Sequence, residues 1–278
     1  MAKLKELENK ARILRKHIIK MTCAAGSGHP GGSLSAADIV AALYFHELRL
    51  DPSRPDWPDR DRFVLSKGHA APVLYAALAE RGFFPVEELL NLRKLGSRLQ
   101  GHPVASFVQA PGVEANTGSL GQGLSVAQGM ALAARLEGAS WRTYCMLGDG
   151  EMQEGQVWEA LQCAHTYELN NFFAIIDVNN LQIDGHTWEV SPNLDFVAKL
   201  EAFGYEVIEL DGHDTQAISD AFDALRESKN GKPKGLVLNT IKGKGVSYME
   251  DQAGWHGKAP NTEQYEQAMA ELEKGLDQ

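Results

Sequence analysis

The sequence predicts an α/β fold, a doubly wound and mainly parallel sheet with helices on both faces. Short β-type runs alternate with helical runs along most of the chain, which is typical of parallel strands joined by crossover helices. The run Phe172–Ile176 is continuously apolar, as expected for a central strand that is buried on both faces.

The N-terminal part of the chain is predicted to be helical. Its apolar residues recur at three- and four-residue steps and form one stripe of a helix, namely Leu4, Leu7, Ala11, Leu14, Ile18 and Met21. Ser35 followed by Asp38 resembles a capping box, which predicts a second helix that runs through Ile39 and Leu43. The proline-rich segment Asp51–Pro58 is expected to end this helical region.

Strands and helices alternate in the remainder of the chain. The predicted strands are Arg62–Ser66, Thr143–Leu147, Phe172–Val178, Glu206–Leu210 and Leu236–Ile241. The predicted helices are Ala70–Arg81, Glu154–Leu169, Leu194–Phe203 and Thr215–Ser228, with a peripheral amphipathic helix over Thr262–Leu276. Because the sequence has no internal repeat and no low-complexity linker, we expect residues 1–278 to form a single domain.

Composition and charge exclude several classes of function. The 278 residues carry a net charge of -10 and no long basic run, which argues against nucleic acid or an anionic membrane as the main partner. No apolar stretch approaches the ~20 residues of a membrane helix, and the N-terminus is charged where a signal peptide would be apolar. Cys23, Cys145 and Cys163 form no CxxC pair, so a disulfide framework or a zinc ribbon is not expected. We therefore expect a cytoplasmic protein with reduced thiols.

Polar loops follow two of the predicted strands. Gly148-Asp149-Gly150 comes after one strand and opens a helix, and Asn179-Asn180 comes after the next strand. Ligands of doubly wound sheets gather at the carboxyl ends of the strands. Carboxylate and amide oxygens suit Mg²⁺, while a helix N-terminus and an unhindered glycine backbone accept phosphate oxygens. Either motif alone is explained as well by a helix cap or a turn, but together they favour a site for a Mg²⁺–phosphate complex in a solvent-facing loop.

A glycine-rich segment near the N-terminus also matches a dinucleotide-binding pattern. Gly26-Ser27-Gly28-His29-Pro30-Gly31 has the form GxGxxG, which in a dinucleotide-binding domain follows a strand and opens a helix. Here the segment follows a helical stripe and contains a proline. A nicotinamide dinucleotide site is therefore not expected.

Several segments together resemble the transketolase family. The pair of Gly148-Asp149-Gly150 and Asn180 resembles the thiamin diphosphate fingerprint, and further family segments occur in family order over Gly26–Pro260. These are Ser27-Gly28-His29-Pro30-Gly31-Gly32, Ser66-Lys67-Gly68-His69-Ala70, Gly101-His102-Pro103, Thr117-Gly118-Ser119-Leu120-Gly121-Gln122-Gly123, Lys242-Gly243-Lys244-Gly245 and Trp255-His256-Gly257. The implied fold is the diphosphate-binding domain of the thiamin diphosphate enzymes.

The resemblance implies a cofactor site for thiamin diphosphate and Mg²⁺, with Ca²⁺ or Mn²⁺ as substitutes for the metal. By motif, Asp149 and Asn179 would bind the metal with their side chains, and Leu181 with its carbonyl. Further cofactor contacts would come from the glycine loop, two histidines and two residues against the rings, namely Gly148, Gly150, His69, His256, Gly118 and Leu120.

The resemblance also divides the nine histidines into two groups. His29, His69, His102 and His256 would line a substrate channel, where imidazoles move protons to and from sugar hydroxyls. Glu154 would reach across a subunit interface, although a solvated residue of a first helical turn would look the same in the sequence. For His17, His46, His165, His186 and His213 we expect ordinary surface or core roles.

The reaction that the resemblance implies is ketol transfer, in which a two-carbon unit passes from a ketose phosphate to an aldose phosphate. The cofactor serves as the electron sink. Such a reaction belongs to carbohydrate metabolism of the pentose phosphate type. The resemblance covers the diphosphate-binding domain and not the pyrimidine-binding or C-terminal domains of a complete transketolase. The chain thus resembles the N-terminal subunit of a split transketolase, active only with a C-terminal partner and with two copies of each chain.

Two alternatives remain at this point. The chain could belong to another thiamin diphosphate enzyme, such as a deoxyxylulose-phosphate synthase or a 2-oxo acid dehydrogenase E1 α-subunit, although the contexts of His29 and His256 favour transketolase. It could also be a non-catalytic cofactor-binding module. A pure scaffold, however, has no physical need for the metal and histidine positions.

Overall fold

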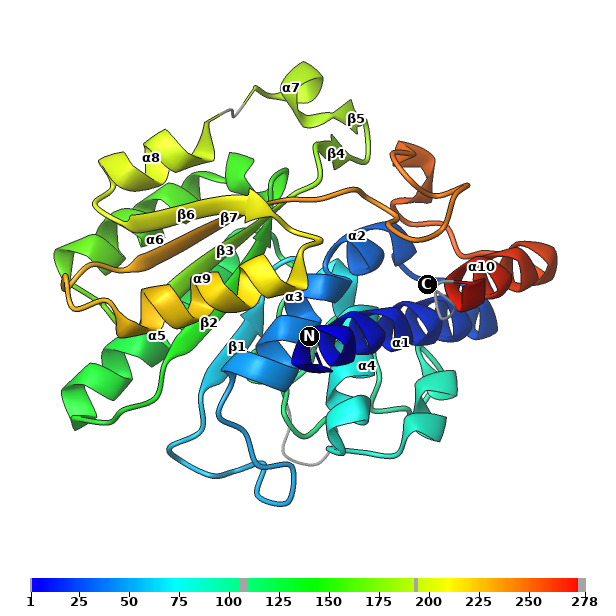
Figure 1. Cartoon of the computed structure of the whole chain (residues 1–278), viewed down its shortest axis with the longest axis horizontal. Helices are drawn as coiled ribbons and strands as arrows, with labels where there is room; N and C mark the ends of the chain where they lie inside the picture. The colour runs from blue at the N-terminus through cyan, green and yellow to red at the C-terminus, as the bar shows by residue number, and fades with distance from the viewer. Residues whose placement is uncertain (1, 106–109, 193–194, 275–278) are drawn as a thin grey trace.

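A single parallel sheet organises the chain. The computed structural model describes all residues except 1, 106–109, 193–194 and 275–278. Five strands lie in the order β1-β2-β3-β7-β6, and every neighbouring pair is parallel. Their bounds are Arg62–Leu65 for β1, Thr143–Gly148 for β2, Phe172–Val178 for β3, Glu206–Asp211 for β6 and Lys234–Asn239 for β7. The predicted doubly wound α/β class is confirmed (Figure 1).

The central strand β3 is buried along its full length. It pairs with β2 from Thr143↔Phe172 to Gly148↔Asp177, and its other edge pairs with β7. Side chains along a strand alternate between the two faces of the sheet. Tyr144 and Met146 of β2 accordingly belong to one hydrophobic cluster, while Cys145 and Leu147 belong to the other.

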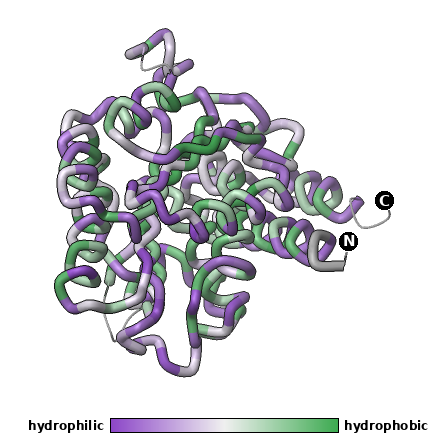
Figure 2. Tube along the Cα trace, turned by 60° about the vertical axis from the view of Figure 1, so that its left-hand side comes forward, coloured by the Kyte–Doolittle hydropathy of each residue, from purple (hydrophilic) through white to green (hydrophobic). Residues whose placement is uncertain are grey.

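Helices cover both faces of the sheet, and the hydrophobic strands lie between them (Figures 1 and 2). One cluster packs residues of α1 (Ala2–Ala25), α3 (Ala37–Ala42), α4 (Ala71–Arg81) and α9 (Thr215–Glu227) against the sheet. The other packs α5 (Gln122–Glu137), α6 (Gly155–Thr166) and α8 (Phe196–Ala202) against the opposite face. The helix α10 (Thr262–Lys274) lies beside α1, at the periphery as predicted.

The shorter elements are concentrated in the loops. They are α2 (Pro30–Ser35), a π-helical turn over Leu43–Glu47, 3₁₀ turns over Gly68–Ala70, Val86–Asn91, Glu151–Gln153 and Ala253–Trp255, the hairpin of β4 (Leu181–Gln182) and β5 (Gly185–His186), and α7 (Thr187–Val190). The hairpin and α7 project from the carboxyl edge of the sheet (Figure 1).

Two local predictions were wrong. Ser35 does not cap a helix: it is the last residue of α2, and its hydroxyl donates to the Gly32 carbonyl and to buried Asp177. The next helix, α3, has Ala36 as its N-cap and runs through Ile39 as predicted, and the chain stays helical at Leu43, where the π-helical turn over Leu43–Glu47 begins. The helix α5 was not predicted, because its glycine-rich start resembles a loop. The predicted helix ends Leu194 and Leu276 lie outside the described residues.

The structure also bears on the glycine-rich segment near the N-terminus and on the search for membrane helices. The GxGxxG segment follows α1 and its last two residues begin α2, so a helix and not a strand precedes it. Within the described part of the chain, no helix is long and apolar enough to cross a membrane.

Candidate active site

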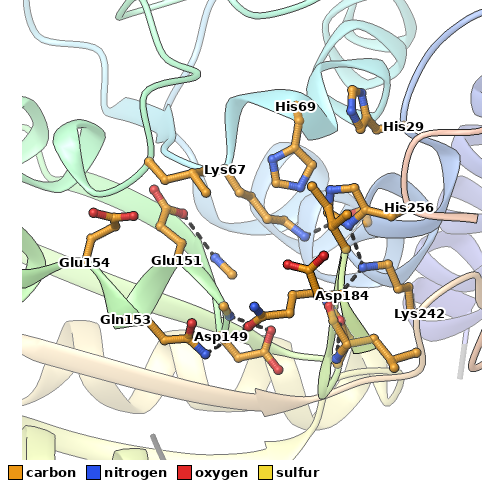
Figure 3. Close-up of a pocket in the computed structure, with 18 of the residues that line it drawn as sticks. His29, Lys67, His69, Asp149, Glu151, Gln153, Glu154, Asp184, Lys242 and His256 are labelled. Carbon is orange, nitrogen blue, oxygen red and sulfur yellow. Dashed lines mark hydrogen bonds between the residues drawn. The ribbon is translucent and has the colours of Figure 1, made fainter. Parts of the chain in front are cut away.

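The site lies where four adjacent strands end. Lys67 and His69 follow β1, Asp149 follows β2, Asn179 follows β3 and Lys242 follows β7. Because parallel strands present their carboxyl ends at one edge, these loops meet around a cavity of about 340 Å³. The cavity has oxygen-rich loops at one end and imidazoles at the other (Figure 3).

At the oxygen end, backbone donors hold the Asp149 carboxylate. Its two oxygens accept from the Gly150 N–H at 2.9 Å and from the Asn180 N–H at 2.5 Å. Asn180 adopts a left-handed conformation with φ of +62°, which asparagine tolerates better than most residues. Asp149 is only 2% exposed, so the expectation of a solvent-facing loop was wrong. The Asp149 N–H donates to the carbonyl of Asp177 at 3.2 Å, which keeps this residue against the end of the neighbouring strand β3.

Burial and the nearby Asp177 carboxylate raise the pKa of Asp149 to about 6. A buried carboxylate next to a second one is costly without a compensating cation. The oxygen end therefore suits a hard cation for two reasons: it carries negative charge, and its donor atoms are oxygens.

Asn179 presents its amide oxygen because Asp177 fixes the amide group. The Asn179 Nδ2 donates to Asp177 at 3.3 Å, and a carboxylate can only accept. The Asn179 Oδ1 is thereby turned toward the loop, where it accepts from the Leu181 N–H at 3.2 Å. The Leu181 carbonyl accepts from Lys242 Nζ at 2.9 Å and has a second lone pair to offer. The three predicted metal ligands thus line one cavity.

The imidazole end brings together the four histidines that the sequence singled out. The His69 and His256 rings are stacked with centroids 4.9 Å apart, and His29 lies 5.4 and 5.5 Å from them. His102 continues the row, with its ring centroid 6.3 Å from that of His29. The Nδ1 atom of His29 is buried and has no hydrogen-bond partner among the described residues.

All four rings are held in the neutral form. Burial lowers the pKa of His29 to about 4 and that of His256 to about 3, with nearby cations adding to the effect. Burial lowers the pKa of His69 well below its usual range and, together with Arg93, also lowers that of His102. Neutral imidazoles can both donate and accept a proton.

Two buried lysines, neither of which was predicted to have a role, also line the cavity. Lys67 Nζ donates to the Gly32 carbonyl at 2.8 Å and forms a short ion pair with Asp177. Lys242 Nζ contacts His256 Nδ1 at 2.9 Å, and burial lowers the pKa of Lys242 to about 8 (Figure 3). Since Nδ1 accepts from the ammonium, the ring proton of His256 is left on Nε2. Each lysine follows an apolar strand within three residues, and this position was the available signal in the sequence.

Glu151 is another residue without a predicted role. It is buried, and its carboxylate accepts from Ser66 Oγ at 2.5 Å, from the Gly121 N–H at 2.9 Å and from the Gly148 N–H at 3.2 Å. The carboxylate thus ties together three of the loops that frame the cavity. Glu154, in contrast, is exposed at the N-cap of α6 and borders the cavity without capping the helix.

Glycines allow the close approach of the loops. Gly118 has φ of +135°, and a Cβ there would lie 2.8 Å from the ring of His102. A Cβ at Gly68 would lie 2.6 Å from the Gly118 nitrogen. Gly118 and Leu120 border the cavity, as do Gly148 and Gly150 of the loop after β2.

His29, His69 and His256 line the cavity, whereas His102 lies beside it, against Gly118. The other five histidines lie elsewhere and have partners of other kinds. His17, His46 and His213 contact Glu80, Asp223 and Asp38 at 2.9, 3.1 and 2.7 Å, respectively. His186 stacks on Trp188, and His165 packs beside Gly204.

Comparison with known proteins identifies relatives of the whole chain. The family described as "Transketolase, thiamine diphosphate binding domain" matches residues 5–277. The 6-deoxy-6-sulfo-D-fructose transketolase subunit SqwG of Clostridium sp. is 44% identical, over 97% of this chain and 97% of that protein. One subunit of the apulose-4-phosphate transketolase of Phocaeicola vulgatus is 42% identical, over 98% of this chain and 95% of that protein.

Single-chain relatives are matched over less than half of their length. Human transketolase is 44% identical over 97% of this chain, which spans 42% of that protein. The crystal structure of Campylobacter jejuni transketolase superposes with a TM-score of 0.89 at 35% identity, covering 96% of this chain and 42% of that one. The chain belongs to the transketolase family and corresponds to its thiamine diphosphate binding domain.

Proposed function

We propose that this chain is the N-terminal subunit of a two-chain transketolase, which transfers a two-carbon ketol unit from a ketose phosphate to an aldose phosphate. One observation carries the proposal: the chain matches almost the full length of two relatives named as transketolase subunits, but only 42% of single-chain transketolases. The family match to transketolase also disfavours the related thiamin diphosphate enzymes.

In this proposal Asp149, Asn179 and the Leu181 carbonyl hold Mg²⁺, or Ca²⁺ or Mn²⁺ in its place. These three oxygen donors line one cavity and form the hard donor set that such cations prefer. His69, His256 and Lys242 bind the diphosphate, because these nitrogen donors line the cavity without a carboxylate partner among the described residues. Gly148 and Gly150 leave room for the phosphates, and Gly118 and Leu120 for the rings.

When bound, thiamin diphosphate supplies an electron sink for the two-carbon unit. The chain's own contribution is to bind, orient and move protons. His29 and His102 are neutral and lie farther along the row, where they can hold a proton at a substrate hydroxyl. His256, with its proton on Nε2, can donate toward the cavity.

A partner chain would complete the site. Apolar side chains are exposed on the projecting segment beside the cavity, with Ile183 71%, Trp188 42% and Val190 43% exposed. An exposed apolar group of this kind is typical of a surface that another chain covers. Glu154 is exposed at the same mouth, which supports its role across an interface. We propose two copies of each chain, because closed two-fold assemblies are the most common.

Two further points belong to the proposal. Residues 1–278 form a single diphosphate-binding domain, which is supported by the one five-stranded sheet on which both hydrophobic clusters pack. The protein works in the cytoplasm, where the free thiols of its three cysteines would persist.

Reconstitution tests the proposal. The purified chain with Mg²⁺, thiamin diphosphate, a ketose phosphate and an aldose phosphate should be inert. Adding the C-terminal partner should produce ketol transfer that saturates at equimolar chains, with a mass in solution that fits two copies of each. Robust turnover by this chain alone, free of host transketolase, would overturn the two-chain assignment. Absence of turnover with the partner would instead favour a non-catalytic cofactor-binding module.

A further inference from the structure

Lys242 lies in a tight turn that follows β7. The turn runs from Ile241 to Lys244, and the Lys244 N–H closes it by donating to the Ile241 carbonyl at 3.2 Å. Gly243 has φ of +80°, which the third residue of such a turn often requires. From this turn Lys242 reaches into the cavity, where its Nζ contacts His256 Nδ1 at 2.9 Å (Figure 3). The place of the ammonium in the cavity therefore depends on how the turn is held.

The side chain of His213 holds the first residue of the turn. His213 lies between β6 and α9, and its Nε2 accepts from the Ile241 N–H at 2.8 Å. Its Nδ1 contacts Asp38 Oδ2 at 2.7 Å. Burial alone would raise the pKa of Asp38, but Arg15 and His213 together hold it below its usual range, so this carboxylate is ionised and can only accept. The ring proton of His213 is thus on Nδ1, and the neutral ring keeps the Nε2 lone pair for Ile241.

The same carboxylate is linked to the last residue of the turn. Arg15 forms an ion pair with both oxygens of Asp38, with Nη1 at 3.1 Å from Oδ1 and Nη2 against Oδ2. The Arg15 Nε donates to the Lys244 carbonyl at 3.0 Å. Both members of the ion pair are buried, with Asp38 5% and Arg15 8% exposed. One ionic network based on α1 and α3 therefore holds both ends of the turn that carries Lys242.

We propose that His213 is a positioning residue that sets the Lys242 ammonium in the diphosphate site, with Asp38 and Arg15 as its support. The inference rests on the proposed function, in which Lys242 binds the diphosphate. Without an acceptor at Nε2, the Ile241 N–H loses its partner, and the turn moves to find another one. Residues behind a binding group commonly fix its orientation in this way, as the partners of metal-bound histidines do.

Two amide substitutions separate the roles of the two ring nitrogens. The amide of glutamine lies at about the distance of Nε2 from the backbone, and that of asparagine at about the distance of Nδ1. In the reconstituted two-chain complex, His213→Asn should weaken Mg²⁺-dependent binding of thiamin diphosphate about fivefold, as for one lost hydrogen bond. It should also speed hydrogen exchange of the Ile241 amide in the purified chain. His213→Gln keeps an acceptor for Ile241, so both quantities should stay within about twofold of wild type.

A double-mutant cycle with Lys242→Ala distinguishes positioning from a general loss of structure. In the Lys242→Ala background, His213→Asn should change cofactor affinity by less than about twofold. Equal losses in both backgrounds would overturn the proposal, because His213 would then act independently of Lys242. His46→Asn is the matched control: His46 also pairs with an aspartate, Asp223, at 3.1 Å, but its ring makes no hydrogen bond to the turn. It should leave cofactor affinity and Ile241 exchange unchanged.

The two readouts also separate this inference from the proposed function. In every variant that folds, cofactor affinity should fall where the Ile241 amide loses its protection and stay where the protection stays. A variant that exchanges fast but binds the cofactor normally would overturn the positioning role, and so would a protected variant that binds weakly. Failure of the unmodified complex to bind thiamin diphosphate would refute the proposed function and this inference with it.

Discussion

The two ends of the cavity differ in how far the chain itself satisfies their polar groups. At the oxygen end, backbone N–H groups hold Asp149, and Asp177 orients the amide of Asn179. At the imidazole end, Lys242 is the hydrogen-bond partner of His256, and the other three rings contact no carboxylate among the described residues.

The histidines outside the site provide an internal control for this difference. His17, His46 and His213 each contact a carboxylate of the chain. The four rings of the row instead face cations and one another. The chain thus satisfies the polar groups of the oxygen end itself and leaves the rings of the imidazole end without a carboxylate partner among the described residues.

Asp149→Ala is the strongest test of the oxygen end. Loss of a neighbour that only supports a metal ligand typically costs 10- to 100-fold in affinity, so loss of the carboxylate itself should cost roughly 100-fold or more in Mg²⁺-dependent cofactor binding. Calorimetric titration of the reconstituted complex measures the affinity for the cofactor. Asp184→Ala, at the exposed rim of the same cavity, is the control and should bind normally. Unchanged affinity in Asp149→Ala would remove this residue from the metal site.

Replacement of single histidines tests whether the rings of the imidazole end have two different roles. His69→Ala and His256→Ala should each weaken cofactor binding about 10-fold and also lower turnover, because these rings stack beside Lys242, in the proposed diphosphate site. His102→Ala should lower turnover more than cofactor affinity, since its ring lies farther along the row.

His17→Ala is the control for the histidine series, because its ring pairs with Glu80 away from the cavity. It should change neither cofactor affinity nor turnover. If His69, His102 and His256 had equal effects on cofactor affinity, the division into two roles would be wrong.

Glu154→Gln tests whether the mouth of the cavity is completed by another chain. Glu154 is exposed, so the free energy of unfolding of the chain alone should change by less than about 0.5 kcal/mol. Turnover of the two-chain enzyme should fall about 10-fold, as for loss of a charge-assisted hydrogen bond. Glu159→Gln, one turn along the same helix and also exposed, should change neither quantity. A loss of stability in the chain alone would make Glu154 a structural residue.

The smallest expected effect is the pH dependence of stability. In the unfolded chain His256 takes up a proton near pH 6.5, whereas in the fold its pKa is about 3. Its contribution to stability is therefore present above pH 6.5 and declines as the pH falls toward 3. Urea unfolding at pH 7.5 and 5.5 should show a smaller pH-dependent loss for His256→Gln than for wild type. An identical loss in both proteins would show that this ring is protonated as easily in the fold as in the unfolded chain.

The predicted strands show how much of the fold can be derived from the sequence. Phe172–Val178 was predicted with its observed bounds, because a central strand must be apolar on both faces. The failures occurred where tertiary contacts override local preference. Ser35 has the chemistry of a cap, but its hydroxyl is used by Asp177, which is 142 residues away in the sequence. The start of α5 is rich in glycine because Gly123 packs against Ser66.

The sequence alone determined the fold class, the family and the residues that gather at the cavity, since apolar periodicity and loop motifs are local properties. Only the tertiary structure decided how those residues act on one another. Asp177 is an ordinary strand residue until it is seen to hold Lys67 and Asn179 at once. The neutrality of the histidine row and the buried state of Asp149 follow from burial and from charges brought together by distant segments. Such through-space effects depend on distance and exposure, which the order of residues does not specify.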